Sequence, residues 1–399
     1  MNDIFKSDKH LFRTWAEIDL DAAENNFLKL KSAADGRKTC AVIKANAYGH
    51  GAVALGRLYS ELGADFLAVS NMGEALELRG AGIALPILIL GYVAPECAEA
   101  AAKNGITLAV YSLPYAKALS EAASGAGVTL DVHLKFDTGM GRIGFFTSEE
   151  GENSLNDALL SAKLPSLSVT GAFTHFAVAD GGDSREDREY TLKQAERFKL
   201  AKEYMLSHGV SLPLCHVSNS AATLDYPDLA HDMVRLGISL YGLVPSFDVK
   251  NPLALEPVMT LKSVISHVKT VNKGTSISYG RTFVAQKPMR VATVPIGYAD
   301  GFLRSSSAAG VRLTVGGRDV PILGRVCMDQ LMIDVTDVPE ARLFDEVLIY
   351  GAGAFESADS FALKNGTIGY ECVCAVGHRV PRVYLKNNAC EFIRNYLEQ

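Results

Sequence analysis

The stretch TCAVIKA at residues 39–45 decides the fold, because it is the first of eight short apolar runs along the first half of the chain. The other seven are ADFLAVS (64–70), PILILG (86–91), ITLAVY (106–111), VTLDVHLKF (128–136), VTGAFTHF (169–176), LCHVS (214–218) and HDMVRLG (231–237). The segments between them are rich in Ala, Leu, Glu and Lys and predict helices, for example at 50–63, 72–82, 95–104 and 185–209. Near-continuous Val, Ile and Leu is typical of strands buried on both faces. The pattern predicts an α/β fold with an N-terminal (β/α)8 TIM-type barrel, and a doubly wound parallel sheet is the alternative.

A different pattern follows Pro245. Strand-like segments now lie close together and are separated by Gly, Asp and Asn turns: KSVISHVKTV (262–271), MRVATVPIGY (289–298), VRLTVGG (311–317), DVPILG (319–324), QLMIDVTDV (330–338) and DEVLIYG (345–351). Few helical segments lie between them, which predicts a C-terminal mainly-β domain. We therefore expect domains at residues 1–245 and 246–399. The opening strand, TWAEIDLD at 14–21, precedes the barrel pattern and is a candidate to pair with the C-terminal sheet.

Composition narrows the class of protein. The 399 residues are 48% hydrophobic and 21% charged, as in folded globular enzymes. The 39 Lys and Arg against 45 Asp and Glu give a net charge of −6, which argues against nucleic acid as a partner. The first ten residues lack the apolar core of a secretory signal and no apolar run is long enough to cross a membrane, so we expect a cytoplasmic protein without a membrane partner. The seven cysteines include one close pair, Cys372 and Cys374, without a matching pair for zinc, so we expect reduced thiols and no metal site.

The polar residues that end the apolar runs are the candidate functional residues, because barrel enzymes place reactive groups at the C-terminal ends of their strands. They are Lys44, Lys135, Asp137, Arg142, His175, Asn219, Ser220 and Arg235. Lys44 follows three apolar residues, where burial would lower the pKa of its amine and make it nucleophilic. Schiff-base chemistry is the natural use of such a lysine. The alternative is a structural lysine whose side chain extends from the strand end to solvent.

A second feature of this mouth predicts an anion site. Arg235-Leu236-Gly237-Ile238 follows the eighth strand and opens a short helical segment, SLYGL, where free backbone N–H groups attract an anion. Ser220 can add a hydroxyl donor, and barrels bind phosphate at this place. A phosphorylated ligand with an aldehyde within reach of Lys44 satisfies both features, so we predict pyridoxal 5′-phosphate as the cofactor.

Nine motifs give the chain a resemblance to a known family. They are VIKANAYGHG (42–51), KFDTGMGRIG (135–144), THFAVAD (174–180), HVSNSAA (216–222), VRLGISLYG (234–242), ISYGRTF (277–283), PIGYADG (295–301), GRVCMDQ (324–330) and RVPR (379–382). Together they closely resemble the alanine racemase family, over essentially the whole chain and in the family's order. The resemblance implies a pyridoxal-phosphate enzyme that interconverts L- and D-alanine, supplies D-alanine for peptidoglycan, and works as a head-to-tail homodimer.

The resemblance also implies roles for single residues. Lys44 would hold the cofactor as a Schiff base and act as the base on one face of the substrate Cα, and Tyr279 of the partner subunit would be the opposite base. Two bases are needed because racemisation removes a proton from one face and returns one to the other. His175 would lie between Tyr279 and Arg235, and Arg235 would meet the pyridine nitrogen. A guanidinium keeps its own proton, so that nitrogen should stay unprotonated, which discourages transamination.

The remaining matches concern the cofactor, the substrate and the entrance. Arg142 matches an arginine beside the cofactor's phenolic oxygen and the substrate carboxylate, and Lys135 matches a lysine that is carbamylated in many family members to hold that arginine. The matched phosphate contacts are Tyr48, Ser220, Gly237, Ile238 and Tyr370. Met328 of the partner would lie near the substrate carboxylate and Tyr298 would narrow the entrance. The matches to the outer entryway are Asp180, Arg304, Arg325 and Ile368.

Three alternative functions remain open from the sequence. The first is a racemase of the same fold that acts on serine, lysine or arginine, although Lys135 and the bulky Tyr298, Tyr370 and Met328 favour a small side chain. The second is a non-catalytic pyridoxal-phosphate carrier built from a single barrel, which would need neither the second domain nor Tyr279. The third is a decarboxylase on a related barrel, which would release carbon dioxide from diamino acids.

Overall fold

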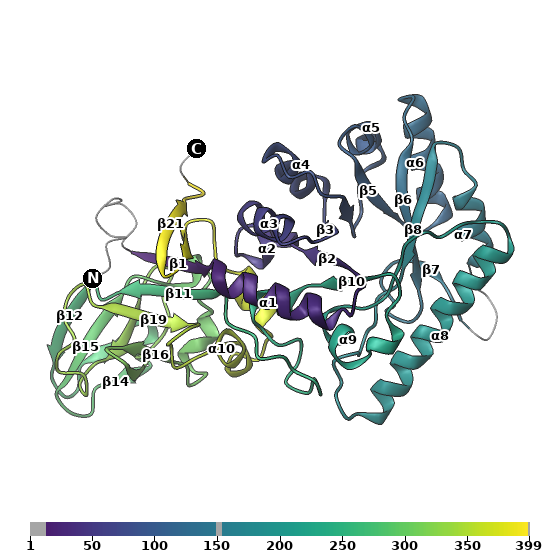
Figure 1. Cartoon of the computed structure of the whole chain (residues 1–399). Coiled ribbons are helices and arrows are strands. Elements are labelled where there is room, and N and C mark those ends of the chain that lie inside the picture. Colours follow the sequence, from purple (N-terminus) through teal and green to yellow (C-terminus); the bar gives the residue numbers. More distant parts are fainter. Residues whose placement is uncertain (1–12, 149–153, 398–399) are drawn as a thin grey trace.

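The computed structural model describes residues 13–148 and 154–397, and it consists of a barrel half and a β-rich half (Figure 1). Each of the eight apolar runs contains a strand of the barrel: β2 (Lys38–Val42), β3 (Phe66–Val69), β4 (Ile87–Ile89), β5 (Ile106–Val110), β6 (Leu130–Asp137), β8 (Leu167–Phe173), β9 (Cys215–His216) and β10 (Met233–Leu236). They pair in parallel in the order β10-β2-β3-β4-β5-β6-β8-β9, and the short β7 (Phe145–Phe146) pairs with β6. Backbone hydrogen bonds of 3.0 Å from Asp232 to Cys215 and from Arg235 to Ser218 close the ring. The predicted (β/α)8 barrel is confirmed, and the doubly wound sheet is not found.

Helices cover the outside of the barrel where the sequence predicts them. They are α3 (Ala52–Glu61), α4 (Met72–Gly80), α5 (Ala98–Lys103), α6 (Leu113–Gly125), α7 (Leu155–Ala162), α8 (Arg185–Ser207) and α9 (Ser220–Asp225), with 3-10 turns η2 (Pro95–Cys97) and η3 (Pro227–Leu229). Side-chain caps fix several of their starts: Asn71 Oδ1 accepts from the Glu74 amide at 3.0 Å at the start of α4, and Asn219 Oδ1 accepts from the Ala222 amide at 2.9 Å at the start of α9. These caps place the first turn of each helix directly after a strand.

The β-rich half contains three sheets in the described residues. The largest, which includes β1 (Thr14–Asp19), has the order β17-β16-β19-β11-β1-β20-β21, the second has the order β12-β15-β18, and β13 pairs with β14. Their bounds are β11 (Met259–Val264), β12 (His267–Val271), β13 (Ser276–Ile277), β14 (Phe283–Val284), β15 (Met289–Val294), β16 (Arg312–Val315), β17 (Arg318–Pro321), β18 (Leu331–Asp334), β19 (Glu346–Tyr350), β20 (Arg382–Lys386) and β21 (Ala389–Arg394). The helical elements are η5 (Tyr279–Arg281), η6 (Tyr298–Asp300), η7 (Arg304–Ser307), α10 (Ala358–Lys364) and α11 (Gly369–Cys374). This half is mainly β, as predicted.

The opening strand belongs to the β-rich half although it is first in the chain. β1 (Thr14–Asp19) pairs antiparallel with β11, with Trp15 opposite Lys262, and parallel with β20, with Glu17 opposite Val383. The predicted strand at 14–21 is too long, because Asp19 caps the next helix: its Oδ1 accepts from the Ala22 amide at 2.9 Å. Helix α1 (Leu20–Ala33) then runs toward the barrel (Figure 1). The two halves are therefore connected at both ends of the barrel segment.

A continuous apolar core joins the two halves. One cluster of buried residues includes Leu67 and Leu108 of the barrel strands together with Leu261 and Ile349 of the large sheet.

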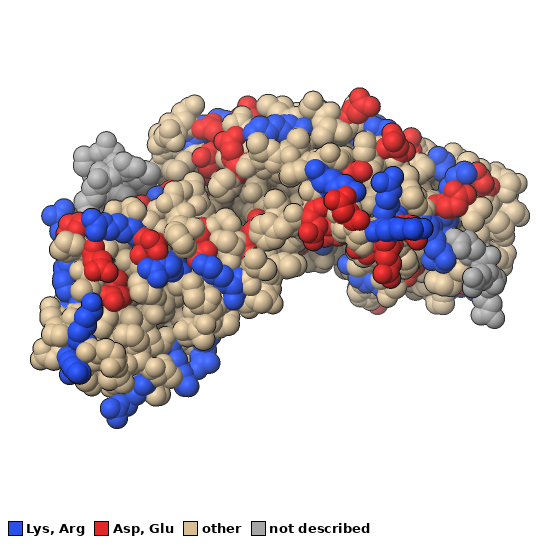
Figure 2. Space-filling view, turned by 90° about the horizontal axis from the view of Figure 1, so that it is seen from below, with Lys and Arg blue, Asp and Glu red and all other residues tan. Residues whose placement is uncertain are grey.

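Figure 2 shows an elongated, bent molecule on whose visible face acidic and basic side chains are intermingled. Across residues 13–148 and 154–397, no helix combines the length and the apolar character needed to cross a bilayer.

Candidate active site

A cavity of about 710 Å³ opens at the C-terminal ends of the barrel strands. One wall comes from the β-rich half, through α11 and the residue before it. Most of the residues predicted from the sequence line this cavity: Lys44, Tyr48, Lys135, Arg142, His175, Asp180, Asn219, Ser220, Arg235, Gly237, Ile238, Ile368 and Tyr370. Tyr279, Tyr298, Arg304, Arg325 and Met328 do not line it. The mouth of the barrel therefore gathers the predicted cofactor residues in one chain, without the residues predicted to come from a partner.

Asp137, which ends β6, has a different role from the other strand-end residues. Its Oδ1 accepts hydrogen bonds from the amides of Gly139, Met140 and Gly141, at 3.0, 2.9 and 3.0 Å. Asp137 thus shapes the loop that leads to Arg142, and it does not line the cavity.

A left-handed turn follows Lys44. Strand β2 ends at Val42, and the four residues Ala45–Tyr48 have φ values of 51° to 54°. None of them is glycine, and a left-handed conformation costs roughly 1–2 kcal/mol for each such residue. A run of this kind persists only where its surroundings fix it, and such runs gather at functional sites. The turn (α2, Lys44–Tyr48) places both Lys44 and Tyr48 on the cavity.

Asn46 holds this turn from its inner side. Its side-chain oxygen accepts from the Ala52 amide at 2.8 Å, and its side-chain nitrogen donates to the hydroxyl of Tyr396 at 2.9 Å. The backbone amide of Ala45 donates to Glu74 Oε1 at 2.7 Å. Asparagine is among the residues that adopt the left-handed conformation most readily, so its presence here fits the backbone.

Contacts from the β-rich half hold the end of the same turn. The buried Arg382 donates from Nε to the carbonyl of Gly49 at 2.9 Å and from Nη2 to that of Val376 at 2.7 Å. Gly49 has φ +83°, and a Cβ there would lie 2.2 Å from the carbonyl oxygen of Val373 in α11. Only glycine permits so close an approach of two backbones. The C-terminal half therefore fixes the segment that carries Lys44.

The Lys44 amine lies in an environment that disfavours its protonated form. Burial lowers the pKa of Lys44, and the positive charges of Arg142 and Arg235 lower it further, whereas Cys374 and Glu74 oppose the shift. A lowered pKa makes more of the unprotonated amine available at neutral pH, which is the nucleophilic form. The predicted character of Lys44 thus follows from its surroundings.

Arg235 organises three histidines beneath the cavity. Its Nη2 donates to His175 Nδ1 at 3.1 Å and its Nη1 donates to His216 Nδ1 at 3.0 Å, while His216 Nε2 lies 2.9 Å from His133 Nδ1. Burial lowers the pKa of all three histidines, that of His133 to about 4, and the charge of Arg235 lowers each further. They are therefore neutral at physiological pH. Because a guanidinium only donates, His175 and His216 carry their proton on Nε2, and His216 donates to His133.

The hydrogen bonds of Arg235 leave one of its groups for a ligand. Nη1 and Nη2 also donate to backbone carbonyls, at 2.9 Å to His216 and Thr174 and at 3.0 Å to Val217. Within the described part of the chain, Nε makes no hydrogen bond of its own, and Arg235 lines the cavity. Burial lowers the pKa of Arg235 to about 10, so it stays protonated at neutral pH.

Lys135 is a second buried lysine in this cavity. Its Nζ donates to the carbonyl of Phe136 at 3.2 Å and lies 5.1 Å from the centre of the Phe173 ring. Burial lowers the pKa of Lys135 to about 7, with a further lowering from Arg235, a partly opposing effect of Asp137 and a small lowering from Arg142. A large share of this amine is therefore unprotonated at neutral pH.

The opposite end of the cavity has the features of an anion site. Ser220 Oγ accepts from the Gly237 amide at 2.9 Å, and an added Cβ at Gly237 would lie 3.2 Å from the Tyr48 hydroxyl. The helical segment after Arg235 is shorter than the sequence indicates: it is the 3-10 turn η4 (Ile238–Tyr241). Helix α9 begins beside it at Ser220. Free N–H groups at the starts of both elements, with two hydroxyls, make this end favourable for a phosphate.

Tyr279, Tyr298 and Met328 lie in loops of the β-rich half, with 70%, 43% and 52% of their surface exposed. His175 contacts Arg235 as predicted, but its expected neighbour Tyr279 does not reach the cavity of its own chain. Tyr279 begins η5, after Ser278, whose φ is +67° and whose hydroxyl donates to the carbonyl of Arg325 at 2.6 Å. These three side chains are held outward, available to another molecule.

The sequence did not identify the residues that hold the cavity residues in place. Asn46, Arg382, His216 and His133 fall within or beside quoted motifs, but their roles depend on contacts between distant segments. The signal was present in part, because arginine and histidine in the apolar runs need buried partners. In the described residues, no group of three or more His, Cys, Asp or Glu side chains could hold a metal ion, and Cys40, Cys97, Cys215, Cys327, Cys372 and Cys374 are thiols without a disulfide.

The fold and this mouth together define a class: barrel enzymes with a C-terminal mainly-β half, whose mouth places a buried lysine amine in one cavity with a turn that is favourable for an anion. Comparison with protein families then gives the particular family. The model of the alanine racemase N-terminal domain matches residues 18–245, and that of the alanine racemase C-terminal domain matches residues 258–384. The chain belongs to the alanine racemase family, which confirms the resemblance seen in the motifs.

Individual relatives resemble the chain over its whole length. The alanine racemase of Desulforamulus reducens is 46% identical over 373 residues, which are 93% of this chain and 98% of that protein. The solved alanine racemase of Clostridium difficile 630 has a TM-score of 0.91 at 44% identity and covers 96% of this chain and 99% of its own. The alanine racemase from Bacillus anthracis, solved with bound L-Ala-P, has a TM-score of 0.89 at 38% identity and covers 97% of this chain and 98% of its own.

Proposed function

We propose that this protein interconverts L- and D-alanine, with pyridoxal 5′-phosphate held in the barrel mouth. One observation carries the proposal: Lys44, whose pKa is lowered, shares a cavity with the anion site at Ser220 and Gly237. The family and the names of the relatives support the reaction and the substrate, and the Bacillus anthracis relative was solved with bound L-Ala-P.

The residues of the cavity fit this cofactor. Gly237 keeps open the space beside the Tyr48 hydroxyl that a Cβ would enter, and Ser220, Ile238 and Tyr370 complete the phosphate end. Lys44 is the amine for the aldehyde, and Arg235 Nε is the group left for the ring nitrogen. When bound, pyridoxal phosphate supplies an electron sink that stabilises negative charge at the Cα of an amino acid attached to it.

The chain supplies the proton chemistry. Lys44 would hold the cofactor. With the substrate in place, its unprotonated Nζ would take the Cα proton on one face, and its protonated form would return a proton there. Arg142, close enough to influence the pKa of Lys44, is the cation for the substrate carboxylate. Arg235 remains protonated and acts only as a hydrogen-bond donor, so it would neither give its proton to the ring nitrogen nor pair with a protonated form of that nitrogen, which a stronger electron sink would need. This restriction favours return of the proton to Cα over transamination.

The second base comes from another copy of the chain in this proposal. Tyr279 is exposed and lies outside its own cavity, as do Tyr298 and Met328, so a head-to-tail homodimer would bring them to the mouth of the partner. There the hydroxyl of Tyr279 would face Lys44 across the substrate Cα, with His175 beside it. The division into domains at 1–245 and 246–399 stays a prediction; the two family models match residues 18–245 and 258–384. The cytoplasmic location and the supply of D-alanine for peptidoglycan stay predictions.

The test is a racemisation assay on purified protein with and without added pyridoxal phosphate. We expect L-alanine to lose its optical rotation fully, without gas release, and faster than serine. Lys44→Ala should fold, lose the absorption band of the lysine-bound cofactor and lose nearly all activity, by roughly a thousandfold or more. Lys29→Ala, which removes a surface lysine paired with Glu256, is the matched control and should behave as the native protein. An intact band in Lys44→Ala would refute the assignment of Lys44.

A further inference from the structure

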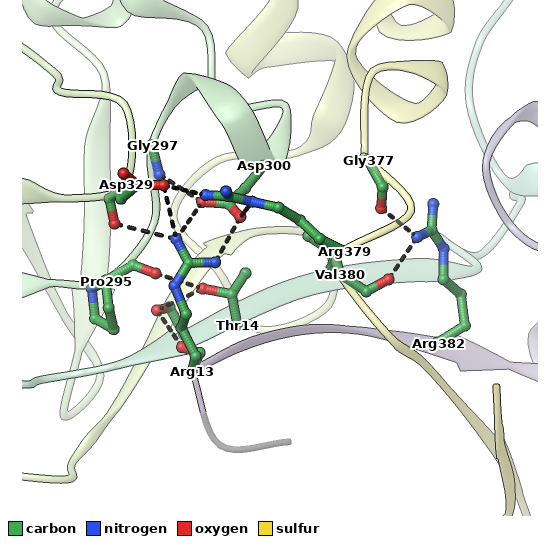
Figure 3. Close-up of polar contacts among 11 residues, drawn as sticks. Arg13, Thr14, Pro295, Gly297, Asp300, Asp329, Gly377, Arg379, Val380 and Arg382 are labelled. Atoms are coloured by element: carbon green, nitrogen blue, oxygen red, sulfur yellow. Dashed lines mark hydrogen bonds and ion pairs between the residues drawn. The ribbon is translucent and has the colours of Figure 1, made fainter. Parts of the chain in front are cut away.

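Asp300 is a buried carboxylate in the loop that carries Tyr298, and two arginines from distant segments bind it (Figure 3). Its side chain is 0% exposed. Arg13, just before β1, donates from Nη1 to Oδ1 at 2.6 Å and from Nη2 to Oδ2 at 2.9 Å. Arg379, before β20, donates from Nε to Oδ1 at 2.7 Å. Such a paired fork fixes both the position and the orientation of a carboxylate.

The same two arginines reach a second loop. Arg379 Nη2 donates to Asp329 Oδ1 at 2.5 Å, and Arg13 Nη2 donates to the backbone carbonyl of Asp329 at 3.2 Å. Figure 3 shows both guanidinium groups between Asp300 and Asp329. The four side chains carry two positive and two negative charges, so the cluster is neutral. It ties the loop at 295–301 to the loop at 324–330.

These two loops carry Tyr298 and Met328 and are also in direct backbone contact. The Tyr298 amide donates to the Cys327 carbonyl at 3.2 Å, and the Ala299 amide donates to the Met328 carbonyl at 3.0 Å. A Cβ at Gly297 would lie 2.3 Å from both of those carbonyl oxygens. The two loops are therefore held together, and Asp300 connects them to the start of β1 and to the loop before β20.

The burial of Asp300 makes this connection specific. Burial alone would raise the pKa of Asp300, but the hydrogen bonds from Arg13, Arg379 and the Gly297 amide more than offset that effect and lower it. Removing one member of a buried charge cluster leaves the others unpaired, which costs far more than losing an exposed pair. Without Asp300, two guanidinium groups would face each other with only Asp329 between them.

We propose that Asp300 is a positioning residue that, through Arg13, Arg379 and Asp329, sets Tyr298 and Met328 for the substrate site of the partner subunit. The proposal rests on the proposed function, which places Tyr298 and Met328 at the partner's mouth. In this proposal, the four charged side chains of the cluster affect alanine binding at the partner's mouth, although none of the four lies in that mouth. The segment that supports Lys44 of the same chain adjoins the backbone of Asp300 and not its carboxylate: the Gly377 amide donates to the Asp300 carbonyl at 3.1 Å, and Arg382 Nη1 donates to the Gly377 carbonyl at 2.7 Å.

Steady-state kinetics of the holoenzyme give the first test. Asp300→Asn keeps the shape of the side chain but removes its charge. Arg379→Gln removes the ion pair with Asp329, and because Arg379 is partly exposed, this variant should fold and test the proposal even if Asp300→Asn does not fold. For either variant we expect KM for alanine to rise about 10-fold, with kcat within about threefold and the cofactor absorption unchanged, because the loss is in substrate binding. Arg379→Lys, which keeps the charge, should recover part of the rise.

Arg312→Gln is the matched control. It removes an arginine that pairs with an aspartate, Asp319, on the β16–β17 hairpin of the same half. Its KM should equal that of the native protein. An unchanged KM in both Asp300→Asn and Arg379→Gln would overturn the proposal while racemisation itself, and with it the proposed function, stands.

Mixed dimers with a different affinity tag on each chain show in which site Asp300 acts. In the first, Lys44→Ala pairs with Asp300→Asn; its one live site combines the intact Lys44 of the second chain with loops supported by an intact Asp300, so KM should be native. In the second, a chain with both substitutions pairs with an unsubstituted chain; its live site faces the altered loops, so KM should be raised about 10-fold. The two dimers contain the same substitutions and differ only in their arrangement.

The reverse result, a raised KM in the first dimer and a native KM in the second, would show that Asp300 acts within its own chain and would overturn the proposal. Complementation between Lys44→Ala and Tyr279→Phe, in which Asp300 is intact, tests the shared site separately. If that complementation succeeds while the mixed-dimer pattern is reversed, only the role of Asp300 is wrong. If the complementation fails, the shared site of the proposed function is wrong.

Discussion

Arg235 determines where the protons lie at the base of the cavity. Because it donates to the Nδ1 atoms of both His175 and His216, each of these neutral rings has its one N–H proton on Nε2. His216 Nε2 in turn donates to His133 Nδ1. Burial keeps the three rings neutral, so the only positive charge in this chain of contacts is the guanidinium. A lysine at position 235 could not donate in this fork, although its charge would be the same.

Lys135 shows how burial prepares a residue for modification. At pH 8, a lysine with a pKa of about 7 is roughly nine-tenths unprotonated, whereas less than about 1% of an ordinary lysine is. Only the unprotonated amine attacks carbon dioxide, forming the N–C bond of a carbamate and releasing one proton. The carbamate is an anion suited to the guanidinium of Arg142. The predicted carbamylation therefore has a physical basis at this position.

We expect Lys135 to become carbamylated as pH rises through about 7, since its folded-state pKa is lowered and its amine gains a proton below that pH. Protein equilibrated with 13C-labelled bicarbonate should show a carbamate carbon signal in NMR spectra at pH 8 that fades toward pH 6. Lys135→Ala should lack the signal, and Lys44→Ala should keep it. A signal lost in Lys44→Ala but kept in Lys135→Ala would place the carbamate on Lys44 and show that the assignment to Lys135 is wrong.

At the scale of elements, the left-handed turn α2, which carries Lys44, connects the mouth of the barrel to the C-terminal half. Its four non-glycine residues adopt an unfavourable conformation, and its partners come from α11, β20 and the end of the chain. Strain of this kind needs rigid support. The β-rich half thus has two roles in the proposed dimer: it supports the lysine segment of its own chain and presents Tyr279 to the other.

The sequence predicts the strands better than it predicts this turn, for a physical reason. The barrel strands are buried on both faces, so each appears as a continuous apolar run that can be read locally, as in PILILG at 86–91. The turn Ala45–Tyr48 has nearby partners in Ala52 and Glu74, but Tyr396, which bonds Asn46, and Arg382, which bonds the following Gly49, are more than three hundred residues away, so their support cannot be predicted from the local sequence. For the same reason Lys44 could be identified as reactive, whereas Asn46 and Arg382 could not be identified as its supports.

Gly36 and Gly49 allow the cost of a left-handed backbone conformation to be measured separately from the cost of a steric clash with a neighbouring backbone. Gly49 and Gly36 have φ values of +83° and +77°, but an added Cβ at Gly49 meets Val373 O at 2.2 Å, whereas one at Gly36 has nothing within 4 Å. Gly36→Ala should cost roughly 1–2 kcal/mol of unfolding free energy from the left-handed conformation alone. Gly49→Ala should cost clearly more and should also weaken cofactor binding, because α11 and the Lys44 turn must separate.

Urea unfolding and titration with pyridoxal phosphate measure these two effects. The result expected is a native cofactor affinity for Gly36→Ala and a lowered one for Gly49→Ala. Equal losses of stability with native cofactor affinity in both variants would show that the contact between Gly49 and α11 does not support the lysine segment.

At the scale of the whole molecule, the groups for one reaction lie in two separate places on the same chain. The barrel mouth contains Lys44, Arg142 and Arg235, while Tyr279 and Met328 face outward from the β-rich half. In the proposed mechanism, with Tyr279 as the second base, a single chain therefore lacks one of the two bases that racemisation needs. The sequence motifs identify both groups of residues, and the resemblance already implies that Tyr279 and Met328 serve the partner; the fold shows that these two side chains do not line the cavity of their own chain. Closed two-fold pairing would complete two equivalent sites at once.

This arrangement predicts that two inactive variants restore each other. Lys44→Ala and Tyr279→Phe should each lose racemisation as homodimers. In a mixed dimer, one mouth combines the intact Lys44 of one chain with the intact Tyr279 of the other, and the second mouth lacks both. With random pairing, half of the dimers are mixed and half of their sites are whole, so activity should return to about a quarter of the native level at equal total protein.

Subunit exchange must be followed by itself, with chains of different mass detected by native mass spectrometry. Two copies of Lys44→Ala with different mass tags are the control, because they exchange without completing any site and should stay inactive. If mixed dimers of Lys44→Ala and Tyr279→Phe form and remain inactive, Tyr279 does not act across the interface. Its exposure would then need another explanation, and the second base would have to come from the cavity of the same chain, where His175 and Tyr48 are the titratable groups nearest to the anion site and the ring-binding arginine.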